Sequence, residues 1–114
     1  MLKTVPQVVM QAQKSLNCIT ADEALTLCKK MNGIIIDVRE SIEYAHKSAS
    51  NTMNIPRGIL EMKMLELYPN SEKAIFIHCA SGVRAILSTE QLKRFGYKNV
   101  WSITCTLEDI CQVL

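Results

Sequence analysis

Three short segments with the character of strands constrain this chain more than any other feature. They are IIID at residues 34–37, AIFI at 74–77 and NVWSI at 99–103. The first lacks the apolar–polar alternation of a strand with one face in water, which is typical of strands covered on both faces. Segments with helical spacing separate the three runs. The sequence therefore predicts an α/β domain with a mainly parallel central sheet flanked by helices.

The segments between these strands carry the spacing and the end signals of helices. Thr20 and Glu23 form a capping box that starts one helix, and Gly33 is predicted to end it. Gly96 is placed just after the end of a later helix. The predicted helices lie at residues 5–16, 21–31, 41–46, 57–67, about 84–95 and 107–114, and a further short strand is predicted at 52–55.

Length, charge and cysteine content exclude several functional classes. A chain of 114 residues suits one domain, expected to span residues 1–114 with a helical extension at 1–17. The 13 basic and 11 acidic residues are too balanced to indicate a nucleic acid or an anionic membrane as partner. No apolar run is long enough for a membrane-spanning helix or a signal peptide, so we expect a cytoplasmic protein. The five cysteines show no C-x-x-C spacing, so we expect neither a disulfide framework nor a structural zinc site.

The segment HCASGVRA, residues 78–85, places a cysteine where parallel α/β sheets gather their ligands. Cys79 follows the second apolar strand, beyond its carboxyl end. Gly82 permits a positive φ, the loop can aim N–H groups inward, and the following helix adds its dipole. Arg84 adds a positive charge, and these fields together favour the thiolate over the thiol. We interpret Cys79 as a partly exposed nucleophile, whereas a buried cysteine that merely caps a strand would not explain the Gly and Arg spacing.

The order of several motifs resembles the rhodanese-like sulfurtransferases over nearly the whole chain. C-x-x-x-x-R after an apolar strand resembles the active-site loop of this family. IIIDVRE (34–40), followed by Glu43-Tyr44, resembles its first signature, and NIP (54–56) matches the end of its second. NIPRGILE (54–61) resembles single-domain members with an extra N-terminal helix, and GYKNV (96–100) resembles the segment before the last strand. The resemblance implies a single three-layer rhodanese-like domain.

The resemblance also implies the chemistry and the residues that carry it. The thiolate of the family's cysteine, here Cys79, attacks a sulfane sulfur of thiosulfate or of a persulfide and becomes a persulfide itself. A thiophilic acceptor such as cyanide, a thiol or thioredoxin then takes the sulfur, and no cofactor or metal is implied. The residues expected to bind the substrate and hold the persulfide through their amides are Ala80, Ser81, Gly82, Val83 and Arg84.

Two other functions stay open at this point. Tyrosine-type phosphatases and some arsenate reductases use H-C-x5-R, but only four residues separate Cys79 from Arg84, which suits one sulfur atom better than a phosphate. The other alternative is a non-catalytic rhodanese-like module that docks a partner or senses reactive sulfur. It is favoured by departures from the family pattern: residues 47–52 replace the usual Gly-His-Ile-Pro-Gly-Ala, and Cys105 and Thr106 replace two glycines.

The remaining candidate residues are assigned mainly structural roles. Asp37 and Arg39 are interpreted as a structural ion pair, as in the family, and His78 as a packed residue rather than a proton shuttle. Arg57 either faces the cleft and attracts anionic donors or forms a surface salt bridge. Cys105 is interpreted as a small residue at a glycine-like site rather than a resolving thiol. The remaining cysteines, interpreted as core residues, are Cys18, Cys28 and Cys111.

Overall fold

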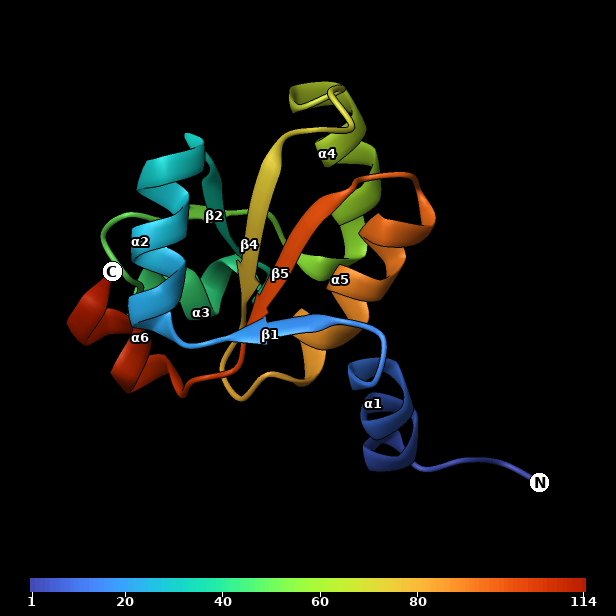
Figure 1. The fold of residues 1–114 in the computed structure, drawn as a ribbon. Coiled ribbons are helices and arrows are strands. Elements are labelled where there is room, and N and C mark those ends of the chain that lie inside the picture. Colours follow the sequence, from blue (N-terminus) through green and yellow to red (C-terminus); the bar gives the residue numbers. More distant parts are fainter.

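Five strands form the centre of the molecule, and helices lie on both sides of them (Figure 1). The structure, a computed structural model, describes residues 1–114. The strands are β1 (Asn17–Ile19), β2 (Ile34–Asp37), β3 (Met53–Asn54), β4 (Ala74–His78) and β5 (Asn99–Ile103). The helices are α1 (Val5–Gln13), α2 (Ala21–Met31), α3 (Ser41–His46), α4 (Leu60–Leu67), α5 (Val83–Arg94) and α6 (Leu107–Val113), with a 3₁₀ turn η1 (Arg57–Ile59) before α4.

The sheet is parallel throughout, in the order β1-β5-β4-β2-β3. Its central strand is β4, where Ile77 lies opposite Ile36 of β2 on one side and Ser102 of β5 on the other. Because parallel strands end at the same edge of a sheet, the segments that follow β2, β4 and β5 meet there. The predicted α/β class with a mainly parallel sheet is confirmed.

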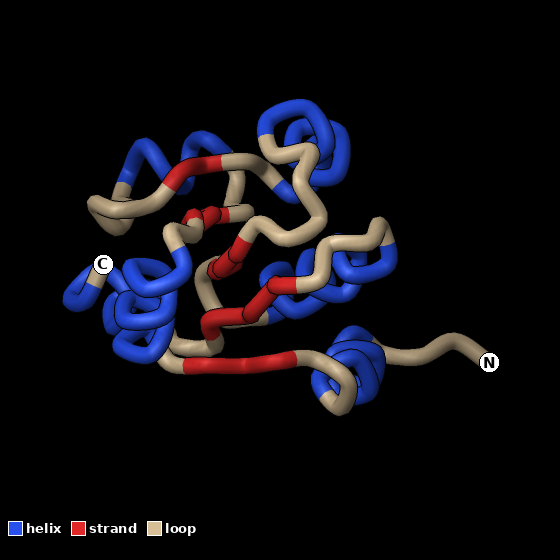
Figure 2. The backbone as a smooth tube through the Cα atoms, turned by 45° about the horizontal axis from the view of Figure 1, so that its top comes forward, coloured by secondary structure: helices blue, strands red, loops and turns tan.

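One face of the sheet is covered by α4 and α5. Leu60 and Met64 of α4 and Leu92 of α5 are fully buried in the same cluster as Ile77 of β4. These helices present apolar residues three or four positions apart, which places them on one face of each helix. Figure 2 shows this layer of helices on one side of the strands and a second layer on the other.

The opposite face is covered by α2 and α6. Ala24 of α2 and Ile110 of α6 are buried in one cluster with Phe76 of β4. The ring of Phe76 also stacks on Trp101 of β5, with the ring centroids 4.8 Å apart. A strand buried on both faces is apolar at most positions, which explains the run AIFI at residues 74–77 of β4; His78, its last residue, is a buried polar residue.

The two ends of α2 show how local sequence determines this helix. At its start, the Thr20 hydroxyl accepts from the Glu23 N–H and the Glu23 carboxylate accepts from the Thr20 N–H, so the predicted capping box is confirmed. The prediction that Gly33 ends the helix was wrong, because Asn32 takes the left-handed conformation, with φ of 51°. Gly33 has another role: a Cβ atom there would lie only 2.8 Å from the ring of Phe76. Gly33 therefore allows the chain to pass close to β4.

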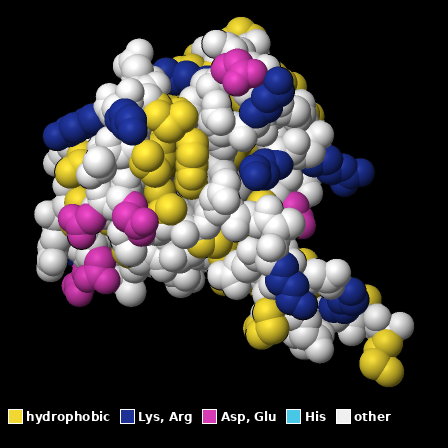
Figure 3. Space-filling model, in the orientation of Figure 1, with side chains coloured by type: hydrophobic (Ala, Val, Ile, Leu, Met, Phe, Trp, Pro, Cys, Tyr) yellow, Lys and Arg dark blue, Asp and Glu magenta, His cyan; other side chains and the backbone are white.

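The N-terminal helix α1 is present, but much of its apolar face is uncovered. Ala12 is its only buried residue, Val5 and Val8 are exposed, and Leu16 lies beyond the end of the helix. Figure 3 shows this segment protruding from the body of the molecule with hydrophobic side chains on its surface. Helical spacing thus predicted the helix but not how little of it the rest of the chain would cover.

Most of the other predicted elements are confirmed, with small changes at their ends. α3 has the predicted bounds, β3 is shorter than predicted, and the segment 57–67 begins with the 3₁₀ turn η1. β1 was not predicted, because it has three residues, two of them exposed, at the edge of the sheet. None of the helices has the length and apolar character that crossing a membrane requires.

Candidate active site

The loop between β4 and α5 wraps around the sulfur of Cys79. Gly82 has a φ of +101°, a left-handed conformation that glycine adopts without strain. This conformation turns the backbone so that the Gly82 N–H donates to Cys79 Sγ over 3.1 Å, and the Ala85 N–H donates over 3.3 Å. Both donors belong to the N-terminal end of α5, where the helix dipole favours a negative charge. The arrangement can hold a thiolate, or a sulfur atom bonded to it.

Two features of this loop differ from the sequence-based prediction. Cys79 is buried, with an exposed fraction of 1%, rather than partly exposed. The sulfur points toward the amides of Gly82 and Ala85. The residues that follow Cys79 are half-buried at Ala80 and exposed at Ser81. Ala85, one residue beyond the predicted set 80–84, donates one of the two N–H groups. Helix geometry is the signal that predicts this donor, because the first turn of a helix has free N–H groups.

Buried hydroxyl groups anchor the first turn of α5 to the sheet. The Ala85 carbonyl lies 2.9 Å from the Thr89 hydroxyl oxygen and 3.3 Å from the Ser102 hydroxyl oxygen of β5, and one of these hydroxyls donates to it while the other donates to its neighbour. The two hydroxyl oxygens lie 2.6 Å apart. Because Ser102 and Thr89 are fully buried, these bonds are shielded from water. They fix the position of the residue whose N–H faces Cys79.

Arg84 does not offer a free charge to the site, because Glu43 of α3 binds it. Its Nη1 donates to Glu43 Oε2 over 2.7 Å and its Nη2 donates to Oε1 over 3.1 Å. Glu43 also accepts from the Glu40 N–H over 2.8 Å, so one carboxylate caps α3 and holds α5. The Arg84 guanidinium lowers the pKa of Glu43 to about 2, and the Glu43 carboxylate raises the pKa of Arg84.

Asp37 and Arg39 form a buried structural pair beside the site. Arg39 Nη2 donates to Asp37 Oδ2 over 2.7 Å and to the Lys47 carbonyl over 2.7 Å. The Asn54 side chain donates to the carbonyls of Asp37 and Arg39, over 3.0 and 2.9 Å. These bonds hold the loop that follows β2, and Asp37 and Arg39 have the ion pair and loop contacts that the sequence predicted.

His78 precedes Cys79 but lies on the other face of the sheet. Successive residues of a strand point to opposite faces, so His78 shares the face of Phe76, whereas Cys79 packs in the cluster of Ile77. Its Nε2 has no hydrogen-bond partner and lies 3.6 Å from Asp37 Oδ2. Burial lowers the pKa of His78, so the imidazole is neutral at neutral pH. His78 is therefore a packed residue and is not placed to take a proton from the thiol.

The other cysteines are separated from Cys79 in their contacts. Cys105 Sγ accepts from the Ala21 N–H over 3.3 Å and packs against the cluster of α2 and α6. The residue after it, Thr106, caps α6 through the Asp109 N–H, in a conformation that needs no glycine. The prediction that Cys18 is a core residue was wrong, because it is exposed on β1. All five cysteines are free, and no three His, Cys, Asp or Glu side chains are grouped as metal ligands.

Comparison with known proteins identifies the family. A family model described as "Rhodanese-like domain" matches residues 20–112. The chain belongs to the rhodanese-like family. The matched region contains four of the five strands, all but β1, and it contains the whole loop from Cys79 to Arg84. The resemblance that the motifs indicated is therefore confirmed.

Two relatives of this rhodanese-like chain have names that refer to sulfur. It is 30% identical to the "Putative sulfur carrier protein YrkF" of Bacillus subtilis (strain 168), over 93% of this chain and 51% of that protein. It therefore spans about half the length of the Bacillus protein. It is 29% identical to the "Thiosulfate sulfurtransferase GlpE" of Coxiella burnetii (strain RSA 493 / Nine Mile phase I), over 71% of this chain and 74% of that one.

A solved structure from Rhodopseudomonas palustris CGA009, described as a protein of unknown function and possible tyrosine phosphatase, has the same fold. It superposes with a TM-score of 0.81 at 21% identity, over 98% of this chain and 92% of that chain. At this identity the likeness shows the fold alone. Together, the family match and the named relatives place the chain among homologues of rhodanese-like sulfurtransferases.

Proposed function

We propose that this rhodanese-like chain is a sulfurtransferase that moves a sulfane sulfur from thiosulfate or a persulfide to a thiophilic acceptor through a persulfide on Cys79. The observation that carries the proposal is the pair of backbone N–H groups, from Gly82 and Ala85, directed at Cys79 Sγ. Two donors at a helix N-terminus stabilise an anionic sulfur without a metal or a cofactor. A general base is not required if the resting sulfur is a thiolate.

The proposed reaction has two half-reactions. The Cys79 thiolate attacks the outer sulfur of thiosulfate, the S–S bond breaks, sulfite leaves with the bonding electrons, and Cys79 carries a persulfide. An acceptor such as cyanide then attacks the outer sulfur and leaves as thiocyanate, which restores the thiolate. The amides of Ala80, Ser81, Gly82, Val83 and Arg84 are proposed to hold the persulfide, with the Ala85 amide added to them.

The site fits phosphoryl transfer or arsenate reduction less well than it fits sulfur transfer. Four residues, rather than five, separate Cys79 from Arg84, so the loop encloses a smaller volume than a phosphate requires. Phosphatase chemistry also uses an arginine that is free to bind the phosphate, and both terminal nitrogens of Arg84 are bound to Glu43.

A second candidate function is a non-catalytic module that docks a partner or senses reactive sulfur without rapid turnover. The observation that favours it is the burial of Cys79, which limits access to the sulfur. Under either function we propose a cytoplasmic location, because five free cysteines suit a reducing compartment. We also propose that residues 1–114 act as one rhodanese-like domain with residues 1–17 as a helical extension.

Steady-state turnover distinguishes the two candidates. Thiocyanate formation from thiosulfate or glutathione persulfide, with cyanide as acceptor, is expected for the wild type and absent for Cys79→Ser. Cys105→Ser is the matched control, because that sulfur also accepts a backbone N–H near the same edge of the sheet. Its turnover is expected to equal the wild type. Turnover that survives Cys79→Ser would overturn the proposal, and no turnover in the wild type would favour the non-catalytic module.

A further inference from the structure

Three arginines lie around the carboxyl edge of the sheet, and each is paired with a carboxylate. Arg39 binds Asp37, and Arg84 binds Glu43. Arg57, which follows β3, donates to both oxygens of Glu61 over 2.9 Å, so the salt-bridge alternative predicted for it is the one observed. The loop residues 80–83 carry no charge, and His78 is buried and neutral. The entrance to Cys79 therefore presents no unpaired arginine.

Within the loop itself, the electropositive groups that remain are backbone N–H groups, and two of them are directed at the sulfur. They act on the cysteine sulfur, because both observed donors point at Cys79 Sγ. The rest of a donor molecule extends beyond the loop, where Arg84 is the nearest cation in sequence and is already neutralised by Glu43. A donor whose outer part carries much negative charge gains little binding energy there. It is also repelled by the thiolate, which has a charge of the same sign.

We propose that Glu43 determines donor specificity: by pairing with Arg84, it makes the site favour sulfane-sulfur donors of low charge, such as the persulfide of an organic thiol, over the thiosulfate dianion. This inference rests on the proposed sulfurtransferase function. In the favoured reaction, the Cys79 thiolate attacks the outer sulfur of R–S–SH and the S–S bond breaks. R–S⁻ leaves with the bonding electrons, and Cys79 holds –S–SH. Glu43 does not touch the reacting atoms and acts only through Arg84.

The test uses two donors with the same type of S–S bond that differ by one charge. Thiosulfate carries two negative charges, and methanethiosulfonate, with a methyl group in place of one oxygen, carries one. The substitution Glu43→Gln keeps an oxygen that can accept from Glu40 and Arg84 but removes the charge. The ratio of kcat/KM for thiosulfate to that for methanethiosulfonate is expected to rise about three- to tenfold. With the charge of Arg84 released, kcat/KM for thiosulfate should also fall as salt is added.

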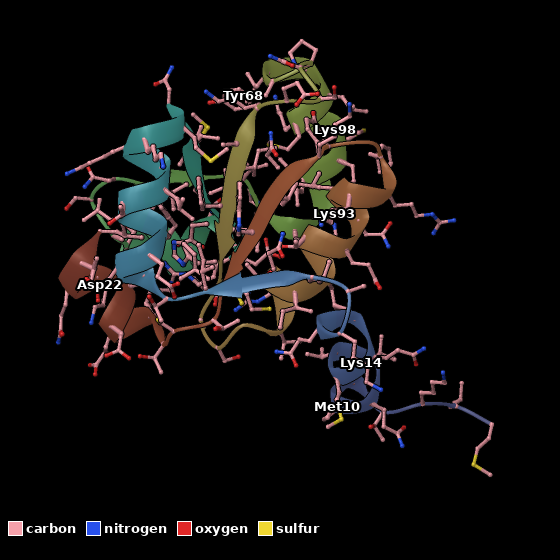
Figure 4. All side chains as sticks on the ribbon, in the orientation of Figure 1. Met10, Lys14, Asp22, Tyr68, Lys93 and Lys98 are labelled. Carbon is pink, nitrogen blue, oxygen red and sulfur yellow. The ribbon has the colours of Figure 1, made fainter.

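Glu72→Gln is the matched control. Glu72 pairs with Lys98 over 3.1 Å at the amino end of the sheet, and Figure 4 shows Lys98 at the opposite end of the strands from the Cys79 loop. The donor ratio is expected to stay at the wild-type value in this variant. Glu43→Asp, which keeps the charge, should also leave the ratio close to the wild type.

The outcomes separate the inference from the function on which it rests. An unchanged ratio in folded Glu43→Gln, or equal losses with both donors, would show that Glu43 is only structural. If Glu43→Gln does not fold, the salt dependence of the wild type is the deciding measurement. The proposal predicts that its kcat/KM for thiosulfate is flat or rises with salt, and a steep fall overturns the proposal. No sulfur transfer from either donor to wild-type Cys79 would instead contradict the proposed function.

Discussion

At the scale of single residues, the site depends on one glycine conformation. The positive φ of Gly82 turns its N–H toward Cys79 Sγ, and no side chain was needed to build that donor. Space is not the constraint, since a Cβ atom at Gly82 would meet nothing within 4 Å. The backbone conformation is the constraint, because residues with a side chain adopt this φ only with strain.

Gly82→Ala is therefore expected to cost about 1–2 kcal/mol of folding free energy and to slow persulfide formation about tenfold or more. Gly96 offers the control, because it has a φ of +108° with equally open surroundings but follows the far end of α5. Gly96→Ala should lower stability by a similar amount, as measured by urea unfolding, and leave the rate of sulfur loading unchanged. Equal rates in the two variants would mean that the Gly82 donor does not matter.

At the scale of elements, the short helix α3 is held to the body by polar contacts. None of its six residues is buried. Glu43 links it to α5 through Arg84, and the Tyr44 hydroxyl donates to the Thr52 carbonyl over 2.7 Å. α3 is thus a polar bridge beside the active-site loop, and its attachment depends on ionisation.

The pH dependence of this attachment follows from the pKa of Glu43. A carboxyl group whose pKa is about 2 when folded and about 4.3 when unfolded stabilises the fold fully above pH of about 4.3. That contribution is lost as the pH falls toward about 2, and it is small because both side chains are about a third exposed. The free energy of unfolding, measured with urea at several pH values, should fall less steeply between pH of about 4.3 and about 2 in Glu43→Gln than in the wild type. A profile parallel to that of the wild type would contradict the assigned pair.

The same elements show which parts of the structure a sequence can predict. β2 and β4 follow from apolar runs, β5 follows from the segment NVWSI, and the loop after β4 follows from the positions of Cys79, Gly82 and Arg84. β1 did not, because a three-residue edge strand bonded to one neighbour carries little pattern of its own. The pairing of Arg84 with Glu43 also escaped prediction, because it joins residues 41 positions apart through the packing of two helices. Burial of Cys79 depends in the same way on the loop's final shape.

At the scale of the whole molecule, one sheet joins both hydrophobic clusters. Every residue of β4 is buried, and its side chains contribute alternately to the cluster of α4 and α5 and to that of α2 and α6. Neither cluster can lose its packing without exposing this strand. The two faces should therefore unfold together rather than as separate units.

Trp101, the single tryptophan, provides the probe for this cooperativity. It stacks on Phe76 in the cluster of α2 and α6, whereas far-UV circular dichroism reports all the helices. In urea, Trp101 fluorescence and circular dichroism are expected to give the same midpoint and the same slope. Two separate transitions would contradict a single cooperative core.

The most direct test of the central claim is the mass of the intact protein after brief incubation with a sulfur donor. Wild type treated with thiosulfate or glutathione persulfide is expected to gain one sulfur, about 32 Da, and to lose it on addition of cyanide, because a covalent intermediate must form and discharge. Cys79→Ser should gain nothing. No gain in the wild type with either donor, or a gain that persists in Cys79→Ser, would contradict a persulfide held at Cys79.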